Sequence, residues 1–129
     1  MRKMILMFLA ISLMLTGCSV FAPRENTYRR ISMDEAIAMM EKESNYIILD
    51  VRRQDEYDAG HIPNAILLPN ESIGTERPAQ LPNKKQLIMV YCRSGNRSQQ
   101  ASEKLANMGY TNIVEFGGIN SWPGEVVTD

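Results

Sequence analysis

Histidine and cysteine are scarce in this sequence, whose 129 residues include one histidine and two cysteines. A zinc site made of four cysteines, or of two cysteines and two histidines, cannot form within one such chain, so we expect no structural metal. Basic charge is not in excess either, since 14 Lys and Arg residues stand against 15 Asp and Glu residues. No global positive field attracts a polyanion, so nucleic acid is not an expected partner.

The rest of the composition is that of one small globular domain. Hydrophobic residues make up 44% of the chain and charged residues 22%, which is enough apolar side chain for one core. No internal repeat or low-complexity stretch is present. A disordered, collagenous or multidomain protein is therefore excluded.

The first 17 residues have the order of charge and hydrophobicity that is typical of a secretory signal. Arg2 and Lys3 precede an apolar run from Met4 to Leu15 whose single polar residue is Ser12. The run is shorter than the ~20 residues that a membrane-spanning helix needs. A permanent transmembrane anchor is therefore the weaker interpretation.

The residues from Leu15 to Cys18 (LTGC) resemble a bacterial lipobox, the signal at which a lipoprotein is cut before its cysteine and diacylated on that thiol. On this interpretation residues 1–17 are a lipoprotein signal peptide. Lipidated Cys18 then anchors an exported domain to the extracytoplasmic face of a bacterial membrane. Residues 18–27 contain a proline and no apolar periodicity, so they form a tether, and residues 28–129 form the domain.

The pattern of the domain predicts alternating strands and helices. Mainly apolar runs predict strands covered on both faces, at 46–49, 65–68, 87–91 and 112–116. A capping-box pattern at Ser32 and Glu35 begins a helix over about 33–43. Helical spacing predicts another over 98–108, with Gly109 as its C-terminal cap. This alternation favours an α/β fold with a central, mainly parallel sheet and helices on both faces.

Polar segments follow two of the predicted strands directly, at residues 50–53 and 92–97. Ligands of parallel sheets bind at the carboxyl ends of the strands. Two separate segments therefore point to a site at the same edge of the sheet.

The segment from Cys92 to Ser98 (CRSGNRS) carries the strongest signal of chemistry. A turn from a strand into a helix gathers backbone N–H groups around one point, and the helix N-terminus adds about half a positive charge. Arg93 and Arg97 add full charges, so the thiolate of Cys92 is favoured. Gly95 lets the backbone turn around the sulfur. A small buried cysteine is the plainer alternative, but these neighbours favour a nucleophile.

The length of this loop bears on which anion it holds. Cysteine-dependent phosphatases place an arginine after five intervening residues, whereas here Arg97 follows Cys92 after four and Ser98 occupies the phosphatase position. The shorter ring suits a persulfide better than a tetrahedral phosphate, and the loop contains no Asp to act as an acid. A phosphatase or an arsenate reductase is therefore a possible function, but the least favoured one.

Three motifs in the chain resemble those of the single-domain rhodaneses, a family of sulfurtransferases. They are DVR with EY and GHIPNA over residues 50–65, CRSGNR over residues 92–97, and FGGI with Trp122 over residues 116–122. The corresponding family patterns are DVR-x3-EY-x2-GHIPGA, CRxGxR and GG-x3-W. Asn64 stands where the family has glycine, and asparagine also tolerates a positive φ.

The resemblance implies a rhodanese-like three-layer α/β fold and a ping-pong sulfur transfer without a cofactor. Cys92 would take a sulfane sulfur from a small anion such as thiosulfate and pass it, as a persulfide, to cyanide or a thiol. The substrate-binding residues would be those of the loop, with its N–H groups stabilising the terminal sulfur: Arg93, Ser94, Gly95, Asn96, Arg97 and Ser98.

Outside the loop, the first motif contains further polar candidates. Arg52 is a substrate-binding candidate, because it either reaches the active loop or pairs with Glu56. Asp50 and Glu56 are expected to hold the first motif together by hydrogen bonds. His61 is expected to have a structural role in its turn.

A hypothesis of a different class is a binding or sensing module. Such a module would keep the rhodanese fold without turnover, and its thiol would report oxidants or polysulfides. Turnover discriminates the two hypotheses, because a sensor is modified once and then stops.

Overall fold

The computed structural model describes residues 27–129 and contains a five-stranded sheet whose strand order is β1-β5-β4-β2-β3. All neighbouring strands run parallel. The strands are β1 (Arg29–Arg30), β2 (Tyr46–Asp50), β3 (Ile66–Leu67), β4 (Leu87–Cys92) and β5 (Ile113–Gly118). The expected parallel sheet is confirmed.

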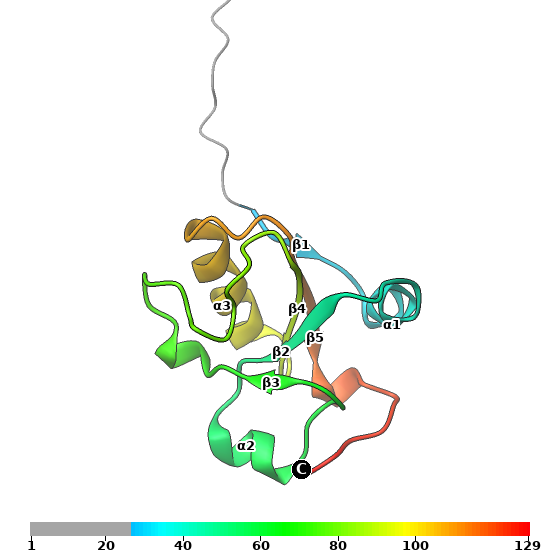
Figure 1. Cartoon of the computed structure of the whole chain (residues 1–129). Coiled ribbons are helices and arrows are strands. Elements are labelled where there is room, and N and C mark those ends of the chain that lie inside the picture. Colours follow the sequence, from blue (N-terminus) through cyan, green and yellow to red (C-terminus); the bar gives the residue numbers. More distant parts are fainter. Residues whose placement is uncertain (1–26) are drawn as a thin grey trace, which may run out of the picture.

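Helices cover both faces of this sheet, with α1 on one side and α3 on the other (Figure 1). The helices are α1 (Met33–Lys42), α2 (Gln54–Ala59) and α3 (Asn96–Asn107), and the short 3-10 helices are η1 (Asn70–Ser72) and η2 (Ile119–Ser121). The expected three layers are therefore confirmed.

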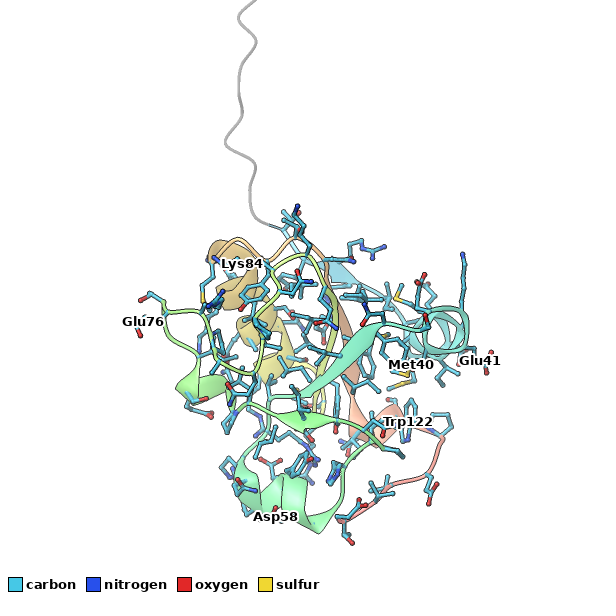
Figure 2. All side chains as sticks on the ribbon, viewed as in Figure 1. Met40, Glu41, Asp58, Glu76, Lys84 and Trp122 are labelled. Carbon is cyan, nitrogen blue, oxygen red and sulfur yellow. The ribbon has the colours of Figure 1, made fainter. Side chains whose placement is uncertain are left out.

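Alternate residues of the strands enter two separate cores. On β4, Val90 packs in one cluster with Leu105 of α3, whereas Met89 packs in the other with Ala36 of α1. Trp122 also packs against the cluster of α1 (Figure 2). Every second residue of a strand faces the same side, so a consecutive apolar run supplies both cores at once.

The helix boundaries follow from local chemistry. The Ser32 hydroxyl accepts a hydrogen bond from the backbone N–H of Glu35 at 3.1 Å, and α1 begins at the next residue after Ser32. Helix α3 begins at Asn96, earlier than the expected residue 98, because Gly95 turns the chain with a φ of 117°. Gly109 follows α3 with a φ of 97°, as expected.

Besides the two short 3-10 helices, one helix and one strand were not expected from the sequence. Helix α2 consists of six residues (QDEYDA) with no buried residue, so it has no apolar periodicity. Strand β1 consists of two exposed arginines. Asn64 has a φ of 68°, which confirms that this asparagine adopts the glycine-like conformation.

A buried ion pair lies at the C-terminal end of β2. The Arg52 guanidinium donates to Asp50 Oδ2 at 2.7 Å and to the carbonyl oxygen of Gly60 at 2.7 Å. The Tyr91 hydroxyl donates to the same carboxylate at 2.6 Å and accepts from the N–H of Ile62 at 3.1 Å. Burial, together with the hydrogen bond to Asp50, raises the pKa of Tyr91 above its ordinary value. This network joins β2 and β4 to the turn at 60–62.

We expect Arg52→Ala to lower the free energy of unfolding by about 3–5 kcal/mol, because it leaves the buried Asp50 charge uncompensated. Urea denaturation measures the loss. Arg53→Ala is the matched control, since Arg53 pairs with Asp55 at the surface, where the two side chains are 64% and 70% exposed, and should change stability little. Equal losses of stability in both variants would contradict the role of Arg52 in compensating the buried Asp50 charge.

Candidate active site

Strand β4 carries Cys92 to the C-terminal edge of the sheet, directly before the loop that leads into α3. The pairing of β4 with β5 shifts register between Val90 and Cys92, which brings Cys92 opposite Gly118. The Cys92 thiol is free and buried, with 1% of the residue exposed. The chain therefore places a free thiol where parallel sheets bind their ligands.

Two groups of the loop contact the Cys92 sulfur. The backbone N–H of Gly95 donates to Sγ at 3.0 Å, and the Ser98 hydroxyl oxygen lies 3.4 Å from Sγ. Gly95 has the left-handed backbone conformation that a side chain would strain. Because of this turn, the loop N–H group faces the sulfur.

Burial by itself raises the pKa of the Cys92 thiol. The contact with the Ser98 side chain and hydrogen bonds from the backbone N–H groups of Ser98, Gly95 and Ser94 together outweigh burial, so the pKa of the Cys92 thiol lies below its ordinary value. The thiolate is the reactive form of cysteine. The loop therefore favours the form that attacks.

The active loop packs directly on the backbone of β5. A Cβ atom at Gly118 would lie 2.0 Å from the carbonyl oxygen of Arg93, which leaves no room for a side chain. The N–H of Asn120 donates to the same carbonyl at 3.2 Å. Gly118, the second glycine of the FGGI motif, therefore leaves room for the active loop. The sequence pattern did not indicate this role.

An ion pair ties α2 to the start of α3. The Arg97 guanidinium donates to both carboxylate oxygens of Glu56, with Nη2 to Oε2 at 3.0 Å, and Glu56 accepts from the backbone N–H of Arg53 at 3.3 Å. The hydrogen bond from Arg97 is the main cause that lowers the Glu56 pKa to about 2. Arg97 is thus held in place by Glu56, whereas Arg93 is exposed.

Of the predicted loop residues, Gly95 and Ser98 contact the sulfur, whereas Arg52 lies elsewhere. Its guanidinium is bound by Asp50 and the Gly60 carbonyl, so it meets neither expectation, contact with the active loop or pairing with Glu56. Arg52 is buried, and these partners account for its side chain. The substrate-binding roles of residues 93–98 stay predictions.

One residue of the site escaped sequence reasoning. Glu115 on β5 is 1% exposed, and its Oε1 accepts from the Ser98 hydroxyl at 2.7 Å and from the Gly117 N–H at 2.9 Å. The available signal was an acidic residue inside the otherwise apolar run IVEF. A buried charge in a strand requires hydrogen-bonding partners, and here they belong to the active site.

His61 has structural partners. Its Nδ1 lies 2.9 Å from the Tyr57 carbonyl oxygen, and its ring stacks on the Tyr57 ring with centroids 3.7 Å apart.

Within residues 27–129, no group of three or more His, Cys, Asp or Glu side chains is arranged to hold a metal ion. No helix in the same range is long and apolar enough to cross a membrane. Cys18 and the signal peptide lie outside the described residues.

Relatives among curated proteins include named sulfurtransferases. The thiosulfate sulfurtransferase PspE of Escherichia coli is 35% identical over 71 residues, which cover 55% of this chain and 68% of PspE. The thiosulfate sulfurtransferase GlpE of Coxiella burnetii is 31% identical over 96 residues, which cover 74% of this chain and 87% of GlpE. The adenylyltransferase and sulfurtransferase UBA4 of Candida albicans is 32% identical over 117 residues, but the match spans 26% of UBA4.

Solved structures of rhodaneses share the fold. A rhodanese-related protein of Thermoplasma volcanium aligns with a TM-score of 0.66 at 30% identity, covering 79% of this chain and all of that one. A rhodanese of E. coli, solved with anions, aligns with a TM-score of 0.59 at 34% identity, covering 65% of this chain and 99% of that one. The family model described as a rhodanese-like domain matches residues 32–125. The chain therefore belongs to the family of rhodanese-like domains.

Proposed function

We propose that this protein moves a sulfane sulfur from a small anionic donor such as thiosulfate to cyanide or a thiol, through a persulfide on Cys92. The observation that carries the proposal is the position of Cys92 Sγ, 3.0 Å from the Gly95 N–H at the start of α3. Donors in this position stabilise negative charge on sulfur. The names of the relatives PspE and GlpE support the same reaction.

In the first half-reaction the Cys92 thiolate attacks the outer sulfur of thiosulfate. A bond forms between the two sulfur atoms, the sulfur–sulfur bond of the donor breaks, and sulfite leaves with the electron pair. The negative charge then resides on the outer sulfur of the persulfide. Backbone N–H groups of the loop stabilise this charge without having to reorganise.

In the second half-reaction the acceptor attacks the outer sulfur of the persulfide. Cyanide leaves as thiocyanate, or a thiolate leaves as its own persulfide, and the electron pair of the broken bond returns to Cys92 as thiolate. The same contacts that lower the Cys92 pKa make this thiolate a better leaving group. The cycle then starts again.

The two loop arginines have different roles in this proposal. Arg93 is exposed, so it attracts the anionic donor from solution. Arg97 is bound by Glu56, so it holds the loop against α2. That the E. coli rhodanese structure was solved with anions is consistent with an anion-binding loop.

We expect Cys92→Ser to lower thiocyanate production from thiosulfate and cyanide by roughly three orders of magnitude or more, because the hydroxyl is a far weaker nucleophile. The intact protein should gain about 32 Da, one sulfur, at Cys92 on exposure to thiosulfate. Activity that survives in Cys92→Ser would overturn the proposal. A persulfide without turnover would favour the sensing module instead.

The pH dependence of stability tests the Glu56–Arg97 pair. Glu56 has a pKa of about 2 in the folded protein against an ordinary value of 4.5, so the unfolded chain takes up the proton first as the pH falls. The stabilisation is complete above pH 4.5 and is lost as the pH falls towards about 2. We expect the free energy of unfolding to fall more steeply over this pH window in the wild type than in Glu56→Gln. Parallel plots of the free energy of unfolding against pH for the two proteins would contradict a stabilising Glu56–Arg97 ion pair.

We also propose that the protein is exported and anchored through lipid on Cys18, as the LTGC sequence predicts. Cys18→Ser removes the thiol to which the diacyl group would be attached. We expect this variant to move from the membrane to the soluble fraction on cell fractionation, because stable attachment requires the lipid chains. Persistent membrane association of Cys18→Ser would overturn the lipid anchor.

A further inference from the structure

The carboxylate of Glu115 lies beneath the active loop, and the proposed sulfur transfer does not use it. Its Oε1 accepts from the Ser98 hydroxyl at 2.7 Å and from the Gly117 N–H at 2.9 Å. A Cβ atom built on Gly95 would lie 3.8 Å from the same oxygen. Glu115 is therefore separated from the nucleophile by one hydroxyl group, that of Ser98.

The Ser98 hydroxyl has a single proton and several neighbours that could accept it. Glu115 Oε1 is nearest at 2.7 Å, followed by the carbonyl oxygens of Gly95 at 3.0 Å and Gly117 at 3.3 Å, and by Cys92 Sγ at 3.4 Å. A hydrogen bond to an ionised carboxylate is about twice as strong as one between neutral groups. The proton therefore goes to Glu115, and the Ser98 oxygen accepts from the resting thiol.

The charged groups around this chain of hydrogen bonds include side chains from β1, α2 and α3. From β1, Arg30 Nε approaches Glu115 Oε2 at 3.3 Å, but the Arg30 side chain is 64% exposed and is screened by water. Arg97 of α3 attracts the thiolate, although its charge is paired with that of Glu56 of α2. Cys92 itself ends β4. The Glu115 carboxylate thus has the largely exposed Arg30 as a cationic partner and reaches Cys92 through the Ser98 hydroxyl.

We propose that Glu115 is a positioning residue that acts on Cys92 through Ser98: it binds the Ser98 hydroxyl proton and so holds back ionisation of the resting thiol. When Cys92 loses its proton to solvent, the Ser98 hydroxyl has to leave the carboxylate before it can donate to the sulfur. The backbone N–H groups of the loop favour the thiolate, and Glu115 opposes them. The inference concerns the site of the proposed sulfur transfer, but its test does not depend on turnover.

The variant Glu115→Gln keeps the shape of the side chain and an oxygen for the Gly117 N–H, and removes the negative charge. The rate of alkylation of Cys92 by iodoacetamide, followed over pH in the full chain by mass spectrometry of the Cys92 peptide, reports the thiolate. This readout separates Cys92 from Cys18. We expect the pH midpoint to move down, with alkylation about 3–10-fold faster than the wild type below the midpoint.

Two controls separate a positioning role from a general effect. Glu103→Gln makes the same change of charge on the exposed face of α3 and should leave the alkylation profile unchanged. In a Ser98→Ala background the effect of Glu115→Gln should fall below about 2-fold, because the hydroxyl that links the two residues is gone. An equally large effect in that background would overturn the role of Ser98.

An unchanged or slower alkylation in a folded Glu115→Gln protein would overturn the inference, and slower alkylation would mean that the carboxylate accepts the thiol proton. If Glu115→Gln does not fold, Arg30→Gln takes its place, since Arg30 lies at the surface. Removing this cation should slow alkylation about 2-fold, and no change or an acceleration would overturn the inference. Thiocyanate production in the same samples tests the proposed function separately.

Discussion

The contact between the active loop and the bare backbone of β5 is the constraint on which the site depends. Gly118 presents no side chain, so the Arg93 carbonyl can occupy the space of a Cβ atom. The loop then turns at Gly95 and places its N–H against the Cys92 sulfur. Because the loop lies this close to β5, the carboxylate of Glu115 reaches Ser98. The small residue at position 118 thus leaves room for the loop that carries both the Gly95 N–H and Ser98.

Two arginines near the site are held in ion pairs. Arg52 is bound by Asp50 and Arg97 by Glu56, so neither cation is free to neutralise the sulfur directly. Stabilisation of the thiolate therefore comes from the Ser98 side chain and from the backbone N–H groups of the loop. The backbone dipoles do not have to move as charge shifts from Sγ to the outer sulfur of a persulfide. The ion pairs hold the framework in place.

Sequence reasoning succeeded where a feature depends on neighbouring residues. Consecutive apolar side chains predicted the buried strands, and the turn at Cys92–Ser98 was evident from its glycine and arginines. Helix α2 was missed because its six residues bury nothing. The partners of Glu115 were missed because they depend on the register in which Val90 pairs with Glu115 across the sheet. The pairing of Arg52 likewise depends on the turn at Gly60, which brings a carbonyl to its guanidinium.

The parallel sheet also gives the molecule two functionally different ends. Every strand begins at one end and finishes at the other, so β1 enters at the end where Lys84 precedes β4, while Asp58 of α2 marks the opposite end (Figure 2). Six residues of β4 at about 3.3 Å each separate the two ends by roughly 20 Å. An anchor attached to the chain ahead of β1 would therefore lie at the end of the sheet opposite Cys92.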